Sequence, residues 1–392
     1  MARVEANPTP SVLIWARETA GLTMEFASKK AGVSADRLAN WESGEQRPTF
    51  AQLRKLGTVY RRPLAIFYLE GPPKGFAPMH DFRRAAEHTQ LPNSPELTLE
   101  IRKAHDRRDW ALELYEQIEE RPRELHGALS LSEDPETAAA EVRRILKVAL
   151  RDQITWRADY EAFKQWRLLV ERAGILTFQA NDVETTEARG FSISERPLPV
   201  AVTNIKDAPR GRIFTLVHET AHILLRDGGI CDLHESDDDE RSRVEAYCNH
   251  VAGAALFPRD ALLRADTIQR HKKGEMAWAD EELSELSRRF GGSREAALVR
   301  LLTLGLTTQA YFDEKRAEFQ KRYAEQREQE RLKGGFAPPH EVALTSAGPT
   351  FTSLVIESFN RERITASDVS DYLQIRLKYL SEIQRDYHKV AV

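Results

Sequence analysis

The sequence predicts a mainly helical α+β protein that contains more than one domain. Its 392 residues exceed the roughly 250–300 residues that a single hydrophobic core holds, so two or three domains are expected. Apolar residues recur at helical spacing along most of the chain, whereas three short strand-like runs cluster between residues 174 and 204. These observations predict an N-terminal all-α bundle, a central domain with a small β-sheet and a helical C-terminal segment.

Composition excludes several classes of protein. Hydrophobic residues make up 41% and charged residues 30%, with a mean hydropathy of -0.52, which argues against global disorder and against membrane spans. The first ten residues include no apolar secretory stretch, and we therefore expect a cytoplasmic protein. Two cysteines, Cys231 and Cys248, are too few for a zinc-finger quartet or a disulfide framework and are expected in the core. The net charge of -4 leaves room only for a local basic patch.

Two segments rich in proline and glycine, at 71–75 and 334–339, predict the domain boundaries. The expected parts are a small helical domain at 1–70, a helical linker region at 71–160, the sheet-containing domain at 161–312, and a charged helix with a helical C-terminal segment at 313–392. In the last part, apolar residues between 351 and 380 predict a helical cap, which is a candidate surface for a homodimer or another partner.

The individual elements follow from periodicity and turn residues. Helices are predicted at 95–120 and 134–150, where apolar residues fall near 3.6-residue spacing. The predicted strands are Gly174–Gln179, Gly190–Ile193 and Leu198–Asn204.

The N-terminal domain shows helix-turn-helix spacing. Four short helices are predicted at 13–17, 23–30, 34–43 and 49–60. Thr23 and Ser34 are the expected N-caps of the second and third helices. In such a unit the third helix reaches base edges in the major groove, which makes Ser34, Arg37 and Asn40 the candidate DNA-binding residues. Residues 11–69 hold nine Lys and Arg against five acidic residues, a charge of +4 that suits phosphate neutralisation.

The segment Trp41-Glu42-x-Gly44-x-x-x-Pro48 resembles the lambda-repressor-like (Xre) helix-turn-helix family, and the resemblance implies binding to double-stranded DNA. Two positions depart from that pattern. Met24 stands where the family has glutamine, and Asp36 places a negative charge where phosphates would lie. A helical bundle for protein interaction or dimerisation is the alternative interpretation.

The strongest chemical signal is a His-Glu-x-x-His motif. On a helix, His218 and His222 project from one face and can bind one Zn²⁺. Glu219 then lies beside the metal, where it can act as the catalytic base and accept a proton from zinc-bound water. The alternative, a helix with two histidines on a polar face, leaves Glu219 unexplained.

Glu245 is the preferred third metal ligand. It follows His222 by 23 residues and begins a predicted helix rich in small residues, which can return antiparallel to the first. Asn249 lies one turn further on the same face. It is a candidate to hold one of the metal ligands in place without binding the metal itself. The rivals are His234 and Glu235, in a predicted acidic loop at 232–240, and His250, which points about 140° away from Glu245 on the helix.

Several motifs together resemble the ImmA/IrrE family of metallopeptidases. They are the His-Glu-x-x-His motif, the Glu245-x-x-x-Asn249 helix that ends in Leu256-Phe257-Pro258, Gly190-Phe-Ser, and Pro199-Val-x-Val-x-Asn204. The resemblance covers about 165–310 and implies a zincin-like metallopeptidase domain at 161–312, a Zn²⁺ cofactor with Mn²⁺ as the alternative, and cleavage of Xre-type repressors. Cys248 stands where that family usually has alanine, and Gly292 where it often has valine.

The sequence therefore predicts a zinc-dependent endopeptidase of the gluzincin-like type, joined to a DNA-binding domain. Its expected role is to derepress genes by cleaving a repressor-type protein. The alternative is a DNA-binding regulator whose peptidase-like domain senses a ligand or protein and does not cut. The complete set of His218, Glu219, His222 and Glu245 favours the enzyme, because a domain that only binds has no need of a general base.

Overall fold

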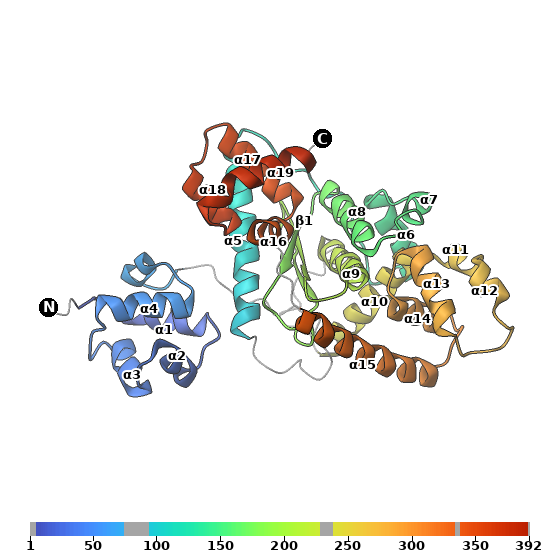
Figure 1. Cartoon of the computed structure of the whole chain (residues 1–392), viewed down its shortest axis with the longest axis horizontal. Helices are drawn as coiled ribbons and strands as arrows, with labels where there is room; N and C mark the ends of the chain where they lie inside the picture. Colours follow the sequence, from blue (N-terminus) through green and yellow to red (C-terminus); the bar gives the residue numbers. More distant parts are fainter. Residues whose placement is uncertain (1–4, 74–93, 228–237, 334–337, 391–392) are drawn as a thin grey trace. The chain divides into compact units, whose positions relative to one another are not determined.

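The computed structural model describes residues 5–73, 94–227, 238–333 and 338–390, and it confirms the mainly helical α+β fold (Figure 1). Within these ranges the chain forms two compact units, of which the first extends to Lys103 and the second begins at Ala104. Cys231 and the predicted acidic loop, apart from residues 238–240, lie outside the described residues, as do residues 74–75 of the first predicted boundary and 334–337 of the second.

The first unit contains the predicted bundle. Its elements are α1 (Pro10–Glu18), α2 (Met24–Ala31), α3 (Ala35–Ser43), α4 (Phe50–Tyr60) and the 3₁₀ helix η1 (Leu64–Tyr68). Thr23 and Ser34 cap α2 and α3 by accepting hydrogen bonds from the amides of Phe26 and Arg37. The core packs around Leu13, Leu38, Trp41, Leu53 and Leu56, none of which is more than 1% exposed.

A buried ion pair joins the first and third helices of this unit. Arg17 on α1 donates from Nε and Nη2 to the two carboxylate oxygens of Glu42 on α3, at 2.9 and 3.0 Å. Both side chains are largely buried, so the two parallel hydrogen bonds fix α3 against α1 within the bundle.

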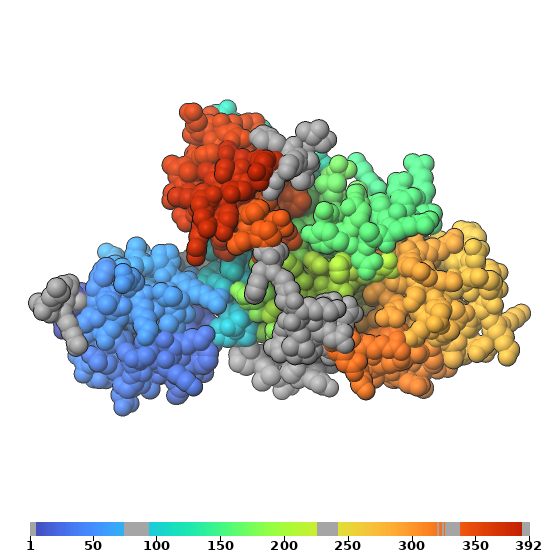
Figure 2. All heavy atoms as spheres, viewed as in Figure 1, coloured from blue at the N-terminus to red at the C-terminus, as the bar shows by residue number. Residues whose placement is uncertain are grey.

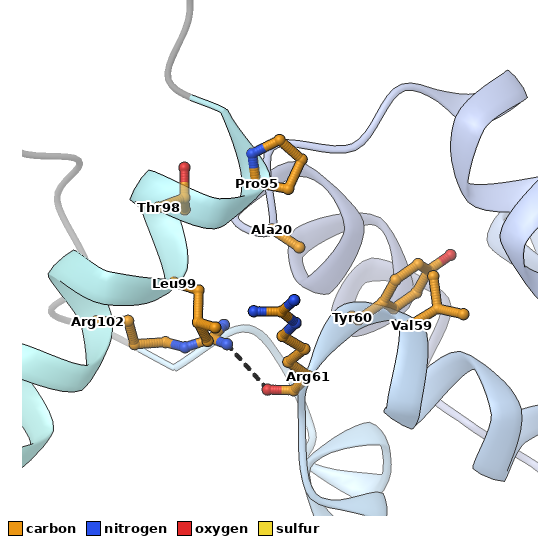
Figure 3. Close-up of a pocket in the computed structure, with 8 residues that line it drawn as sticks. All are labelled: Ala20, Val59, Tyr60, Arg61, Pro95, Thr98, Leu99 and Arg102. Carbon is orange, nitrogen blue, oxygen red and sulfur yellow. Dashed lines mark hydrogen bonds between the residues drawn. The ribbon is translucent and has the colours of Figure 1, made fainter. Parts of the chain in front are cut away.

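Helix α5 (Pro95–Gln117) begins in the first unit, where Arg102 donates to the backbone carbonyl of Arg61 at 3.0 Å (Figure 3). A cavity of about 20 Å³ lies beside this contact, and Ala20, Tyr60 and Leu99 contribute to its lining. A single water needs about 10–15 Å³, so the cavity is too small for an organic ligand.

The sheet of the second unit has three strands: β1 (Leu176–Ala180), β2 (Gly190–Ile193) and β3 (Val200–Asn204). Their order is β1-β3-β2, with β3 parallel to β1 and antiparallel to β2. All three lie where the sequence predicts strands. The last begins at Val200 and not at Leu198, because Leu198 has a left-handed φ of 62° that a strand cannot contain.

Between α5 and the C-terminal segment, the described part of the second unit contains ten helices, of which two pack against the sheet. The ten helices are α6 (Pro135–Ile145), α7 (Leu150–Gln153), α8 (Asp159–Arg172), α9 (Pro209–Asp227), α10 (Asp238–Leu256), α11 (Arg259–Leu263), α12 (Asp266–Arg270), α13 (Asp280–Phe290), α14 (Arg294–Thr303) and α15 (Gln309–Lys333). The single helix predicted at 134–150 is interrupted, because Lys147 has a left-handed φ of 56° that separates α6 from α7. On the face shown in Figure 2, the green surface of α6–α8 adjoins the yellow and orange surface of α11–α14.

Helix α9 lies at the centre of the second unit and packs against α8, α10, β2 and β3 (Figure 1). Helix α6, which belongs to the predicted linker region, packs against α10 and contributes Ala138, Ala139 and Val142 to the same core. The 71–160 segment therefore supplies part of the core of the second unit.

Buried arginine contacts hold α6, α10 and α14 together. Arg300 on α14 is 1% exposed and donates to both carboxylate oxygens of Glu136 on α6, at 2.5 and 2.6 Å. It also donates to the backbone carbonyl of Phe257, directly after α10, at 3.0 Å.

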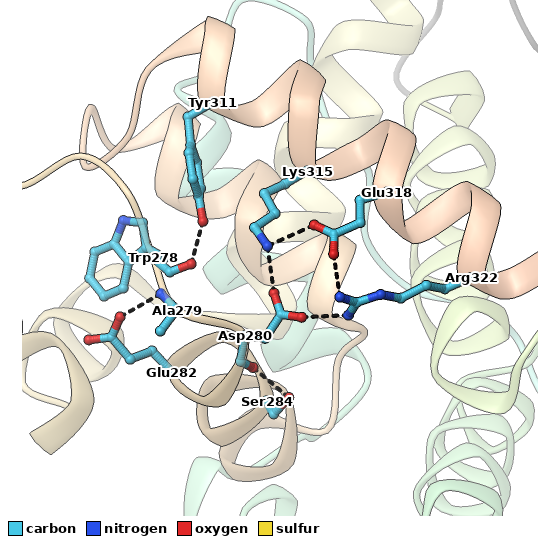
Figure 4. A network of polar contacts seen from close by, with 9 residues as sticks. All are labelled: Trp278, Ala279, Asp280, Glu282, Ser284, Tyr311, Lys315, Glu318 and Arg322. Carbon is cyan, nitrogen blue, oxygen red and sulfur yellow. Dashed lines mark hydrogen bonds and ion pairs between the residues drawn. The ribbon is translucent and has the colours of Figure 1, made fainter.

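The predicted charged helix is α15, and ion pairs hold it against α13 (Figure 4). Asp280, the first residue of α13, accepts hydrogen bonds from Lys315 at 2.8 Å and from Arg322 at 2.5 Å. Both cations also pair with Glu318 on α15 itself. A network of this kind contributes more to stability than isolated surface ion pairs do, because each charge has more than one partner.

The C-terminal segment forms α16 (Pro339–Ala347), α17 (Pro349–Asn360), α18 (Ala366–Leu373), the 3₁₀ helix η3 (Leu377–Tyr379) and α19 (Leu380–Val390). Helices α16 and α17 pack against β1, and Trp110 of α5 stacks on Tyr372 of α18 with ring centroids 4.8 Å apart. Among the described helices, none is both long and apolar enough to cross a membrane.

Candidate metal centre

Helix α9 positions the His-Glu-x-x-His motif in the interior of the second unit. Pro209 is its first residue, and the carboxylate of Asp207 accepts a hydrogen bond from the amide of Ala208 at 2.9 Å just before it. Apolar side chains bury the helix against its neighbours: Ile213, Leu216, Val217, Ala221, Ile223 and Leu224. The motif therefore stands on a rigid element and not on a surface loop.

Helix α10 brings Glu245 to the two histidines. Small residues near its end, Ala252, Gly253, Ala254 and Ala255, allow it to pack closely on its neighbours. Glu245 Oε1 lies 3.1 Å from His222 Nε2, and Glu245 Oε2 lies 3.4 Å from His218 Nε2. The two Nε2 atoms are 3.0 Å apart. Among the described residues, these three side chains form the group whose ligand atoms lie close enough to hold one metal ion.

The spacing of these atoms fits a small divalent cation. A tetrahedral zinc site with bonds of about 2.0–2.1 Å has edges of about 3.3–3.4 Å between ligand atoms. The three distances of 3.0, 3.1 and 3.4 Å approach that value before any adjustment to an ion. His218 and His222 are buried, whereas the Glu245 side chain is 33% exposed, so part of the third ligand reaches solvent.

Electrostatics keep the Glu245 carboxylate charged, whereas a metal ion would have to displace the proton that the raised pKa of His222 favours. Burial raises the pKa of Glu245, but hydrogen bonds from His218 and His222 outweigh it and hold that pKa well below its usual range. For His222, burial lowers the pKa, while Cys248 and Glu245 raise it, with a net pKa well above the usual value. The carboxylate is therefore ionised at neutral pH and available to a divalent ion.

Glu219 lies beside this group and not within it. Its side chain is buried, with 3% exposure, and it projects toward strand β2. A Cβ atom at Gly190 on that strand would stand 3.4 Å from Glu219 Oε1, so the strand backbone runs close to the carboxylate. Gly190 belongs to the Gly190-Phe-Ser motif, but the sequence pattern does not show that this glycine lies near Glu219. The two come together because β2 packs on α9.

The rival ligands fall elsewhere. His250 points away from Glu245, and its Nε2 lies 3.2 Å from Glu136 Oε1 on α6. His234 and Glu235 lie outside the described residues. The candidate supporting residue Asn249 is partly buried one turn after Glu245, and within the described part of the chain its Oδ1 accepts no hydrogen bond. That oxygen can accept a hydrogen bond from a group bound at the site.

The candidate DNA-binding residues share one helix of the first unit. Ser34 and Arg37 are exposed and Asn40 is partly exposed, all on or beside α3. The Ser34 hydroxyl accepts from the Arg37 amide at 3.3 Å, which leaves its hydrogen free to donate to another acceptor. Arg37 lies over the Trp41 ring, 5.8 Å from the ring centroid.

The two departures from the helix-turn-helix pattern have structural explanations. Met24 is partly buried and packs against the core of the bundle, a place where a glutamine amide would lose its solvent partners. Asp36 lies in the first turn of α3, where a negative charge is stabilised by the helix dipole.

Comparison with known protein families agrees with both assignments. Residues 13–67 match a helix-turn-helix family, and residues 170–302 match a peptidase family described as the IrrE N-terminal-like domain. The second range contains the whole candidate metal centre. None of the curated proteins compared with the chain matches it.

Proposed function

Because the chain joins an Xre-like helix-turn-helix domain to a metallopeptidase-type domain of the ImmA/IrrE family, we propose that it is a metal-dependent endopeptidase and a transcriptional regulator. Its proposed substrate is a repressor-type DNA-binding protein, whose cleavage derepresses genes. The observation that carries the enzymatic part is the convergence of His218, His222 and Glu245 on one point, with the buried carboxylate of Glu219 beside it.

His218, His222 and Glu245 are the residues that would hold the metal. Two imidazoles and one carboxylate suit Zn²⁺, whereas Mn²⁺ prefers a set richer in oxygen, so zinc is the proposed cofactor and manganese the alternative. When bound, such an ion lowers the pKa of a water molecule to about 7 and polarises a carbonyl group. Three protein ligands leave the remaining position for water or substrate.

Glu219 is the proposed general base. One of its carboxylate oxygens accepts a proton from the attacking water, and the same group returns that proton to the leaving amide nitrogen as the peptide C–N bond breaks. Burial against β2 holds the carboxylate in place for both transfers, since it is 3% exposed. Asn249 is the proposed positioning residue, with its buried Oδ1 available to a group at the site.

The first unit is the proposed DNA-binding module. Its charge of +4 over residues 11–69 suits phosphate neutralisation, and Lys29, Lys30, Arg37, Arg47 and Arg54 are all exposed. Ser34, Arg37 and Asn40 are the proposed contacts to double-stranded DNA. We propose a homodimer as the DNA-bound form, because helix-turn-helix proteins of this kind bind paired half-sites. The cytoplasm is the proposed location, where such DNA and its repressors occur.

The decisive test compares wild type with Glu219→Gln and Glu245→Ala, using an Xre-type repressor as substrate and metal content as a second readout. Glu219→Gln is expected to keep the metal and to lose at least about 10²-fold in cleavage rate, because an amide cannot accept the proton. Glu245→Ala is expected to lose both cleavage and metal, because one of the three metal ligands is gone.

Each contrary result has a definite meaning. Cleavage by Glu219→Gln at the wild-type rate would assign the base elsewhere. A wild-type protein that holds one metal per chain but cuts no repressor would favour the non-cleaving sensor. A protein without metal after loading would refute the enzyme altogether.

A further inference from the structure

Three charged side chains outside the candidate metal centre meet beside strand β2. Arg189 directly precedes β2, Glu295 lies in the first turn of α14, and Arg316 lies on α15. Arg189 Nη1 lies 4.0 Å from Glu295 Oε2, and Arg316 Nε lies 3.3 Å from Glu295 Oε1. One carboxylate therefore stands between two guanidinium groups, and this Arg–Glu–Arg cluster carries an excess of positive charge. The mechanism proposed above gives it no part.

The cluster adjoins the proposed catalytic base through Gly190. This glycine follows Arg189 in the chain, and a Cβ atom on it would lie 3.4 Å from Glu219 Oε1. Adjacent Cα atoms are about 3.8 Å apart, and an extended peptide advances about 3.3–3.4 Å per residue. On the other side of the cluster, α14 packs against α10, which carries Glu245. A peptide that is cut beside Glu219 therefore brings the residues one or two positions from the cut bond close to Arg189.

The two guanidinium groups keep most of their capacity to donate hydrogen bonds. Each carries five N–H donors, yet within the described part of the chain neither guanidinium donates a hydrogen bond. The side chain of Arg189 is 35% exposed and that of Arg316 is 51% exposed. The buried Arg300 differs from both, because it donates to the two carboxylate oxygens of Glu136. The cluster is therefore accessible and incompletely paired.

Regular elements hold the backbone of the cluster in place. The Arg189 carbonyl accepts a hydrogen bond from the Asn204 amide on β3 at 2.9 Å. On α15, the side chains of Phe312 and Phe319, four residues before and three after Arg316, are buried in the core of the second unit. A binding group on a fixed backbone loses less freedom when it takes up a ligand.

Paired guanidinium groups suit a carboxylate ligand. A guanidinium can donate two parallel hydrogen bonds to the two oxygens of a carboxylate, and its charge strengthens both bonds. A peptide offers a carboxylate either on an Asp or Glu side chain or at its C-terminus. Because the proposed reaction cuts within a chain, the ligand expected beside the cut bond is an acidic side chain.

We propose that Arg189 and Arg316 are specificity-determining residues that bind an acidic side chain of the substrate within two positions of the cut bond. Glu295 holds the two guanidinium groups in place for this contact. The inference rests on the proposed peptidase function, and it deepens that proposal by naming the chemistry of the substrate at the cleavage site.

The test profiles the cleavage of a proteome-derived peptide library by the full-length, zinc-loaded protein, with the cut sites identified by mass spectrometry. Wild type should cut preferentially where Asp or Glu occupies one position within two residues of the cut bond. Arg189→Gln and Arg316→Gln should lose this preference, and Arg189→Glu should replace it with a preference for Lys or Arg. Arg259→Gln, at an exposed arginine of the same unit, is the matched control and should keep the wild-type profile.

A pair of synthetic peptides separates recognition from a structural role. The two peptides differ only by Glu or Gln at the preferred position, and wild type should cleave the Glu peptide with a KM about tenfold lower, at the lower end of what a hydrogen bond between charged groups provides. Arg189→Gln should raise the KM of the Glu peptide to that of the Gln peptide and leave the Gln peptide unchanged. The same exchange of Glu for Gln in the intact repressor extends the comparison to a folded substrate.

The outcomes distinguish failure of this inference from failure of the proposed function. Equal cleavage of the Glu and Gln peptides by wild type overturns the specificity role alone. An equal loss for both peptides in Arg189→Gln also overturns it, because the effect would then come from packing. A preference for free over amidated C-termini, without one for acidic side chains, overturns it by assigning the guanidinium groups to the chain end. A zinc-loaded wild type that cuts neither the library nor an Xre-type repressor overturns the proposed function and the specificity role together.

Discussion

The approach of strand β2 to helix α9 should make Gly190 intolerant of any side chain. A Cβ atom at Gly190 would lie 2.4 Å from Thr215 Cγ2 on α9 and 2.5 Å from the Val202 carbonyl oxygen on β3. Ordinary contacts begin at 3.4 Å, so the strand or its neighbours must move by about 1 Å to accept alanine. One of the two obstacles is backbone, which cannot rotate out of the way as the end of a side chain could.

The expected cost of Gly190→Ala has two parts. Overpacking of this kind destabilises a core by about 1–3 kcal/mol. Because Glu219 Oε1 would lie 3.4 Å from the new Cβ, the displacement also reaches the proposed base, and a shift of about 1 Å at a catalytic group can cost about 10²-fold in rate.

Thermal unfolding and repressor cleavage measure these two effects separately. Gly253→Ala is the matched control, since its Cβ would meet only Arg300 Cδ, at 4.0 Å, and alanine in a helix interior should stabilise by about 0.5–1 kcal/mol. If Gly190→Ala unfolds at the wild-type temperature and cleaves at the wild-type rate, the inferred tight approach of β2 to Glu219 is refuted.

Three further predictions concern charged residues. Glu136→Gln should destabilise the protein by about 2–4 kcal/mol in denaturant unfolding, because it removes the charge that pairs with the buried Arg300 guanidinium. Glu141→Gln is the control and should have little effect, because the partner of Glu141, Arg144, is exposed. Equal unfolding midpoints for the two variants would contradict this prediction. Hydrogen bonds from Lys315 and Arg322 hold the pKa of Asp280 below its usual 3.8, so the Asp280 carboxylate contributes its full stability above pH 3.8 and loses it as pH falls through the lower folded pKa. The loss of stability in Asp280→Asn, measured against wild type, should therefore shrink in acid. A loss that stays constant with pH would refute the assignment. Arg37→Ala should weaken duplex binding by about 1–3 kcal/mol in a fluorescence titration and reduce the salt dependence of that binding. Arg259→Ala, at an exposed arginine of the second unit, is the control and should leave binding unchanged. Absence of duplex binding by the wild-type protein at low salt would exclude DNA recognition.

Local signals predicted most of the fold. The caps at Thr23 and Ser34 and the three strands lie where turn residues and apolar runs place them, because those features depend on neighbours in sequence. The break between α6 and α7 was not predicted. It depends on Lys147 adopting a left-handed backbone, and the apolar periodicity continues across it without interruption. The packing of α6 on α10 was equally hidden, since no local pattern reports a contact between segments so far apart.

The candidate site also has a part that local spacing predicts and a part that depends on packing between distant segments. Helical spacing places His218 and His222 on one face, and a return of the chain brings Glu245 opposite them. Spacing also separates His250 from that face, and the structure gives it Glu136 as a partner on another helix. The contacts of Gly190 could not be inferred in this manner, because they arise from strand β2 and helix α9 approaching in space.

The two residues that depart from the ImmA/IrrE pattern are both buried in the second unit. At Gly292, a Cβ atom would lie 2.5 Å from the ring of Phe257, a fully buried side chain that packs against Phe290 with centroids 5.5 Å apart. The ring thus occupies the space that a larger residue at 292 would need. At Cys248, the side chain has no solvent exposure and belongs to the hydrophobic core of the second unit. Packing therefore explains the glycine at 292, and the small buried side chain at 248 is in keeping with the same close packing of the core.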